Sequence, residues 1–134
     1  MMSEANVEIT KRALDAFNRR DVDGFMELTT CDFEYYPSLV GAVEHRSFSG
    51  REGMEQYFED QRSAWEEFRA LADEFRDLGD HVLALGRMEG RGKGSGVPIG
   101  APFGTITDFR DGKVSRIRVY LDHAEALQAA GLTE

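Results

Sequence analysis

The sequence has one cysteine, few basic residues and no long apolar run, and each shortage excludes a class of protein. Cys31 alone permits no internal disulfide, so nothing requires an oxidising compartment. No apolar run approaches the ~20 residues of a membrane-spanning helix. The first residues, MMSEANVEITKR, contain charges and no apolar signal-peptide core. We therefore expect a cytoplasmic protein with no membrane partner.

The charge balance and the motif content exclude further classes. With 16 Lys and Arg residues against 25 Asp and Glu residues, the net charge of the 134-residue chain is −9. No basic stripe is present, so nucleic acid is not an expected partner. The three histidines lack metal-ligand spacing, and the glycine run offers GKG in place of the phosphate-loop GK[ST]. We expect neither a metal nor a cofactor.

Hydrophobic periodicity predicts helices and strands in separate parts of the chain. Helical spacing predicts helices over residues 3–19, 21–28, 49–65 and 122–131. Alternation and turn residues predict strands over residues 33–37, 68–76, 81–91, 103–110 and 114–121. Asp111-Gly112 suits a two-residue type I′ hairpin. Residues 90–104, rich in glycine, are expected to be a long loop or a bent strand, either structural or forming the rim of a pocket.

Several polar and aromatic residues have simple structural interpretations. Ser49 and Glu52 match a capping box, and the stripe that follows is expected in the core: Met54, Tyr57, Phe58 and Trp65. Asp21 is expected to cap the second helix. For Asp122 a helix N-cap is favoured over a catalytic role. For His45 a solvated loop position is favoured over a general base.

The order of the elements indicates an α+β fold. We expect one domain over residues 1–134, with a cone-shaped, curved, antiparallel or mixed sheet wrapped around three N-terminal helices and a short C-terminal helix. Such a sheet leaves a concave apolar pocket between itself and the helices. A pocket of this kind is the default position for a ligand.

Four segments resemble the nuclear transport factor 2-like superfamily, and within it the SnoaL-like small-domain proteins: NRRDVDGFMEL, SGREGMEQYF, FRDGKV and YLDHAEALQAAG. The resemblance spans residues 7–132. It implies a cone-shaped α+β barrel that is frequently a homodimer through the outer sheet face. The superfamily includes ketosteroid isomerase, polyketide cyclases, limonene epoxide hydrolase and members without known activity, so the fold alone does not define a function.

The enzyme sites of the superfamily are matched only in part. The positions that resemble the tyrosine and two aspartates of ketosteroid isomerase hold Ala13, Tyr36 and Ile106, so we expect no isomerase activity on steroids. The Arg-x-Asp pair of the epoxide hydrolase resembles Arg87-Met88-Glu89. Its last-strand aspartate falls on Val119, which removes one carboxylate from the water-activating triad.

Arg87 and Glu89 share a strand face with Leu85 in the segment LGRMEG. If that face lines the cone, Arg87 stabilises developing negative charge, a desolvated Glu89 is the general base, and Tyr36 donates a hydrogen bond. The expected substrate-binding wall is Phe17, Trp65, Leu85, Ile106, Ile117, Val119 and Leu121. The alternative is an outward-facing pair, solvated or in a dimer interface, because the neighbouring glycines permit a bulge that reverses the facing.

Three functions remain open from the sequence. The first is a cofactor-independent cyclase, isomerase or hydrolase that acts on an apolar cyclic or polyketide-like small molecule. The second is a non-catalytic module that binds a hydrophobic ligand, and the third is a dimeric interaction protein with a filled core. Alternation places Arg116, Arg118 and Tyr120 on the sheet face opposite Ile117 and its neighbours. That long outer face needs cover, so we expect a homodimer.

Overall fold

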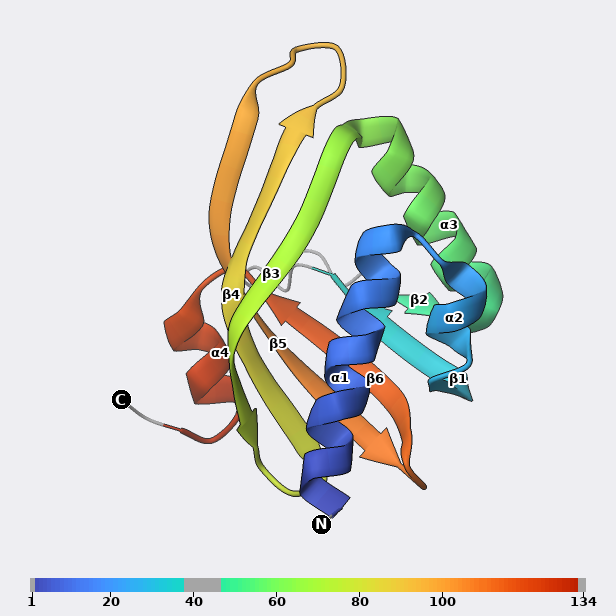
Figure 1. The fold of residues 1–134 in the computed structure, drawn as a ribbon, viewed down its shortest axis with the longest axis vertical. Coiled ribbons are helices and arrows are strands. Elements are labelled where there is room, and N and C mark those ends of the chain that lie inside the picture. The colour runs from blue at the N-terminus through green and yellow to red at the C-terminus, as the bar shows by residue number, and fades with distance from the viewer. Residues whose placement is uncertain (1, 38–46, 133–134) are drawn as a thin grey trace.

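The computed structural model describes residues 2–37 and 47–132 (Figure 1). In chain order the elements are α1 (Met2–Arg19), α2 (Val22–Met26), β1 (Thr29–Tyr36), β2 (Phe48–Ser49), α3 (Gly50–Ala64), β3 (Trp65–Asp77), β4 (His81–Gly92), β5 (Pro98–Arg110), β6 (Lys113–Tyr120) and α4 (His123–Ala129). The predicted α+β class and the short C-terminal helix are confirmed. The two-residue strand β2 was not predicted. None of the described helices is both long and apolar enough to cross a bilayer.

The six strands form one curved sheet in the order β2-β1-β6-β5-β4-β3. Strands β3 to β6 are antiparallel neighbours, as predicted. Strand β1 pairs antiparallel with β2 and parallel with β6, which makes the sheet mixed. Asp111 and Gly112 join β5 to β6 with φ values of 55° and 78°, the pair of left-handed residues that a type I′ hairpin needs.

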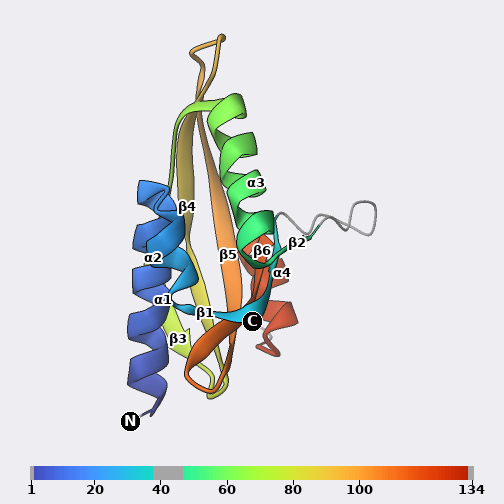
Figure 2. The same cartoon turned by 90° about the vertical axis from the view of Figure 1, so that its right-hand side faces the viewer.

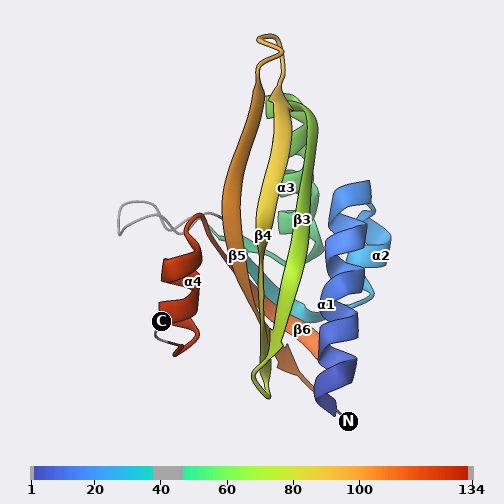
Figure 3. The same ribbon diagram turned by 60° about the vertical axis from the view of Figure 1, so that its left-hand side comes forward.

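Helices lie on both sides of the sheet, and each side has its own apolar core. Helix α1 and helix α4 flank strands β3 to β5 from opposite sides (Figures 2 and 3). The larger core contains the ring pairs Phe17–Phe58 and Phe25–Phe33, with centroids 5.6 and 5.5 Å apart. The smaller core lies beneath α4 and contains Leu83, Leu85, Ile106 and Ala126. Because both faces of β4 are covered, apolar residues occur on both of them.

The helix ends match the predicted caps in two of three cases. The Asp21 carboxylate accepts from the Gly24 N–H, and the Asp122 carboxylate accepts from the Ala124 N–H. Ser49 occupies the N-cap position of α3, but its side chain makes no cap hydrogen bond to a described residue, so the predicted capping box is wrong.

Trp65 is the first residue of β3 and not part of the helix that the sequence predicted. Its backbone has the extended values φ −125° and ψ 134°, so the chain leaves α3 directly into the sheet. The change of period from helix to strand therefore falls three residues before the predicted strand start at Phe68. Trp65 thereby faces the space between sheet and helices instead of extending the helical stripe.

The glycine-rich segment 90–104 is mostly strand. It forms the ends of β4 and β5, joined by a turn, and this arm extends beyond α3 at the top of Figure 1. Pro98 and Pro102 lie opposite Arg91 and Arg87 in this arm, whereas the pairing of β5 with β6 begins only at Gly104. Prolines are tolerated at such a free edge because the missing N–H costs no ladder hydrogen bond. Of the two alternatives predicted for residues 90–104, a long loop or a bent strand, the structure shows strand for most of the segment.

Candidate functional site

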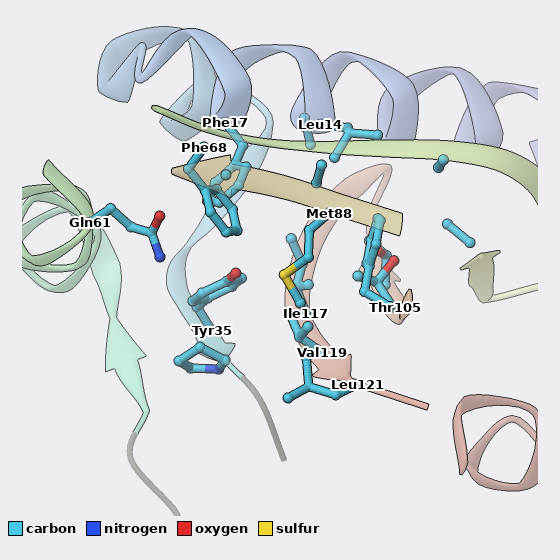
Figure 4. Close-up of a pocket in the computed structure, with 18 of the residues that line it drawn as sticks. Leu14, Phe17, Tyr35, Gln61, Phe68, Met88, Thr105, Ile117, Val119 and Leu121 are labelled. Atoms are coloured by element: carbon cyan, nitrogen blue, oxygen red, sulfur yellow. The ribbon is translucent and has the colours of Figure 1, made fainter. Parts of the chain in front are cut away.

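A cavity of about 340 Å³ lies between α1, α2 and α3 and the inner face of the sheet (Figure 4). Its size lies in the lower part of the ~300–1,000 Å³ range of small-molecule sites. The strands contribute alternate side chains from one face, mostly apolar: Ala70, Ala72, Ala84, Met88, Ala101, Phe103, Thr105, Thr107, Ile117 and Val119. The cavity is therefore suited to an apolar molecule of modest size.

Five of the seven predicted wall residues line this cavity. Phe17 enters from α1 and Trp65 from the start of β3, while the remaining three follow one another on the inner face of β6 and just beyond it: Ile117, Val119 and Leu121. Their role in binding a substrate remains a prediction. The alternation that separates Ile117 and Val119 from Arg116 and Arg118 was a sufficient signal because only one face of β6 is apolar.

Leu85 and Ile106 were predicted to line the same wall, and this placement is wrong. Both are buried on the opposite face of the sheet, in the core beneath α4. On β4 the residues that face the cavity are Ala84 and Met88, so Leu85 points away from it. Because side chains alternate along a strand, an error of one residue in the assignment places every side chain of that strand on the opposite face of the sheet.

The predicted buried charge pair is not formed. The Arg87 side chain is 59% exposed and points to the outer face, and its Nε lies 3.9 Å from Oε2 of Glu89. Glu89 also lies 3.6 Å from Arg69 on the adjacent strand. It sits at the rim, where it borders both the cavity and the surface outside it. For Arg87, the alternative prediction of an outward-facing, solvated side chain is therefore the one that the structure shows.

Tyr36, the third predicted catalytic residue, also faces away from the cavity, and its hydroxyl donates to Glu34 over 3.2 Å. The preceding residue, Tyr35, is 7% exposed and lines the cavity instead. Its ring contacts that of Tyr57 on α3, with centroids 4.8 Å apart, and the two phenols interact. The Tyr57 oxygen also accepts from Nε2 of Gln61 over 2.9 Å. Figure 4 shows Tyr35 and Gln61 extending into the same end of the cavity.

We call Tyr35, Tyr57 and Gln61 the polar cluster. Burial raises the pKa of Tyr35 well above its usual value and also raises the pKa of Tyr57. Both phenols therefore remain protonated at neutral pH and act as hydrogen-bonding groups rather than bases. Oε1 of Gln61 is buried and has no hydrogen-bond partner among the described residues. Sequence reasoning assigned Tyr57 to the core and missed Gln61, although the two share a helix face as an i, i+4 pair.

The remaining candidates lie elsewhere or have structural contacts. His123 donates from Nε2 to the carbonyl oxygen of Gly86 over 2.8 Å and so ties α4 to β4. Cys31 is exposed. His45 lies outside the described residues. Within residues 2–37 and 47–132, no three His, Cys, Asp or Glu side chains gather closely enough to bind a metal ion.

Residues 10–117 match the family model of the SnoaL-like domain. The chain belongs to this family. Among solved structures, this SnoaL-like domain is similar to an NTF2-like protein of unknown function from Burkholderia pseudomallei K96243, with 19% identity, a TM-score of 0.77, and coverage of 92% of this chain and 95% of that chain. TerC, co-crystallised with polyporic acid, shows 22% identity, a TM-score of 0.76, and coverage of 95% and 98%. A candidate SnoaL-like polyketide cyclase from Jannaschia sp. CCS1 shows 20% identity, a TM-score of 0.76, and coverage of 98% and 94%.

At these identities the solved structures show a shared fold. No curated protein matches the chain. The predicted membership of the NTF2-like superfamily, and of its SnoaL-like branch, is confirmed.

Proposed function

We propose that this SnoaL-like domain binds a small, mostly apolar molecule in the cavity between its helices and its sheet. The observation that carries the proposal is the open volume of about 340 Å³ among apolar side chains. Protein interiors are normally packed to the density of organic crystals, and a void of this size forfeits packing energy that a ligand restores. A filled core, the third possibility raised by the sequence, does not fit this volume.

The polar cluster supports a ligand that carries at least one hydrogen-bonding group. Apolar walls supply affinity, about 0.8 kcal/mol for each buried methylene, but little orientation. Tyr35 and Tyr57 are protonated hydroxyls in a dry setting, and such groups fix the orientation of a carbonyl or hydroxyl. One end of the ligand therefore lies against the polar cluster, and its apolar body lies against residues such as Met88 and Ile117.

The test uses phenylnaphthylamine, a dye whose emission rises when it leaves water. Trp65, the only tryptophan, lines the cavity and serves as an energy-transfer donor to bound dye. Val119→Phe places a larger side chain in the cavity and should weaken dye binding at least about tenfold. Val97→Phe is the matched control, because Val97 is 56% exposed at the tip of the arm. Equal dye affinity in the wild type and both variants contradicts the proposal.

A second candidate function is catalysis in the same cavity, as in a cofactor-independent cyclase, isomerase or hydrolase acting on an apolar cyclic or polyketide-like molecule. It is favoured by Glu89, which borders the cavity at its rim. Hydroxyls of the polar cluster would hold the carbonyl whose oxygen gains charge, and Glu89 would accept the proton. Glu89→Gln should then abolish turnover of a cyclisable poly-ketone while dye binding persists. Turnover that survives this change rules out Glu89 as the base.

We also propose that the domain forms a homodimer through the outer sheet face. Arg116 there lies 2.7 Å from Asp108, and Arg118 lies 3.7 Å from the same carboxylate. A second subunit would cover these charged side chains on the outer face of β6. Sedimentation should show a dimer at micromolar concentration, and a monomer alone would contradict this.

A further inference from the structure

A surface depression adjoins the cavity, and five residues border both: Trp65, Phe68, Glu89, Gly90 and Ile99. They come from the start of β3, the end of β4 and the start of β5. We call this shared boundary the mouth of the cavity. Whatever enters the cavity here passes the side chains of the depression, so their charge bears on the kind of ligand.

The depression is basic although the protein is acidic. Its lining contains six cationic side chains and three carboxylates: Arg20, Arg62, Arg69, Arg87, Arg91, Lys93, Glu66, Glu67 and Glu89. This local surplus of three positive charges contrasts with a net charge of −9 for the chain. Two of the cations, Arg69 and Arg87, lie within ion-pair distance of Glu89. Arg62 on α3 is also paired, with Glu59 over 3.2 Å. Arg20 differs from these three.

Arg20 is half-buried and forms no ion pair with a described carboxylate. Its guanidinium lies 5.6 Å from the ring centre of Phe17 and 5.9 Å from that of Phe68. It donates to the carbonyl oxygens of Phe17, Asn18 and Phe68 over 3.2, 3.3 and 3.3 Å. Three of its five N–H groups are used in this way, and two remain. Its φ of 56° is a left-handed value that is uncommon for a side chain of this kind.

The surroundings of Arg20 leave its charge uncompensated. Burial lowers the pKa of Arg20; Tyr57 offsets part of this lowering, and Arg62 adds to it. Phe17 and Phe68, on which the guanidinium lies, both line the cavity. The charge therefore sits beside the mouth, held in place by backbone carbonyls.

We propose that the natural ligand is an amphipathic anion, whose apolar body fills the cavity and whose carboxylate or equivalent group lies at the mouth against Arg20, with Arg62 beside it. A planar guanidinium with free N–H groups fits a carboxylate in bidentate geometry. The anion supplies the counter-charge that no described residue supplies. This inference rests on the proposed binding function and names the chemical class of its ligand.

The test compares naphthylacetic acid with its uncharged amide, naphthylacetamide, as displacers of phenylnaphthylamine from the full-length protein at low ionic strength. The acid should bind about tenfold more tightly than the amide, and added salt should reduce this preference. Arg20→Gln should remove the preference by weakening acid binding more than amide binding, and Arg62→Gln should reduce it. Arg12→Gln is the matched control, because it makes the same change in charge on an exposed side chain of α1.

The possible outcomes distinguish failure of the anionic-ligand proposal from failure of the proposed binding function. If the dye binds and Val119→Phe blocks it, but acid and amide bind equally well, the anionic ligand is ruled out and the apolar cavity site stands. If the dye does not bind the wild type, both proposals fail. Loss of the preference in Arg12→Gln to the same extent would assign it to net charge and overturn the role of Arg20. Should Arg20→Gln fail to fold, an undiminished preference in the exposed Arg62→Gln overturns the proposal.

Discussion

Tyr35 and Tyr57 meet at the cavity wall with ring centroids 4.8 Å apart and ring planes inclined by 61°. One hydroxyl comes from the sheet and the other from α3, so this contact joins two layers of the fold. Gln61, one turn further along α3, donates to the Tyr57 oxygen. Tyr57 is therefore the central member of the polar cluster, because it contacts the Tyr35 ring and accepts the Gln61 hydrogen bond.

Removal of the central hydroxyl should cost more stability than removal of a peripheral one. Tyr57→Phe removes the hydroxyl to which Gln61 donates and with which the buried Tyr35 phenol interacts, and we expect a loss of about 2 kcal/mol in the free energy of unfolding. Tyr35→Phe leaves Tyr57 bonded to Gln61, and we expect a loss of about 1 kcal/mol. Tyr36→Phe is the control on the outer face, with about 0.5 kcal/mol or less. Urea unfolding measures all three, and the reverse order for Tyr35 and Tyr57 would contradict the arrangement.

Stability should fall at alkaline pH, and Tyr35 should account for part of the fall. Burial raises the folded-state pKa of Tyr35 well above the value of about 10 that applies in an unfolded chain. The folded protein therefore keeps a proton that the unfolded chain releases. This contribution is complete below about pH 10 and is lost as the pH rises further. In Tyr35→Phe the urea midpoint should decline less steeply above about pH 10, and an identical decline would show that Tyr35 is not protected.

Neighbouring residues of β4 should respond in opposite ways to substitution, since Met88 faces the cavity and Arg87 faces solvent. Met88→Lys places a charge against apolar walls and should destabilise the fold by more than about 2 kcal/mol and abolish dye binding. Arg87→Met should change stability by about 0.5 kcal/mol or less and leave dye binding intact. Denaturant midpoints measure the change in stability of each variant, and dye titrations measure its binding. Comparable losses in the two variants would mean that the facing of β4 is assigned wrongly.

The fold could be predicted from the sequence because several independent patterns indicated the same order of helices and strands. Helical spacing, a sharp change of period, turn residues such as Asp111-Gly112 and caps such as Asp122 all specified the order of elements. Facing was predictable for β6, where Arg116 and Ile117 distinguish an exposed face from a buried one. It was not predictable for β4, where α4 buries Leu83 and Leu85 on the outer face as thoroughly as the helices cover Ala84 on the inner one.

The placement of Arg87 failed for the same reason as the facing of β4. Once Leu85 is placed on the wrong side, Arg87 follows it, although Glu89 still borders the cavity at the rim. In FEYYP the same one-residue error exchanged Tyr36 for Tyr35. Neither side chain carries a local sign of its facing, because a tyrosine is compatible with both a buried and a half-exposed position. Tertiary contacts from α3, which lie about 20 residues away in sequence, decide which tyrosine is buried.

Gly86 offers a last test of how β4 is held between β3 and α4. A Cβ at this position would meet the carbonyl oxygen of Leu71 and lie 2.6 Å from the Cα of Ala72, next to the bulge in β3. The Gly86 carbonyl also accepts from His123, so a shift of this residue disturbs α4 as well. We therefore expect Gly86→Ala to destabilise the fold by about 2–3 kcal/mol, since backbone atoms have to move to admit the methyl group.

The control for this change is Gly100→Ala, on the strand paired with β4. A Cβ there meets the end of the Arg87 side chain, which is free to rotate into solvent, and otherwise only ordinary contacts. Its effect should be about 0.5 kcal/mol or less. Urea unfolding measures the stability of both variants, with far-ultraviolet circular dichroism to confirm that each is folded at the start. The comparison distinguishes a steric clash with the β3 backbone at Gly86 from a general loss of stability when any glycine of these strands gains a side chain. A Gly86→Ala protein as stable as the Gly100→Ala protein would mean that β3 and β4 are further apart at the bulge than this structure has them.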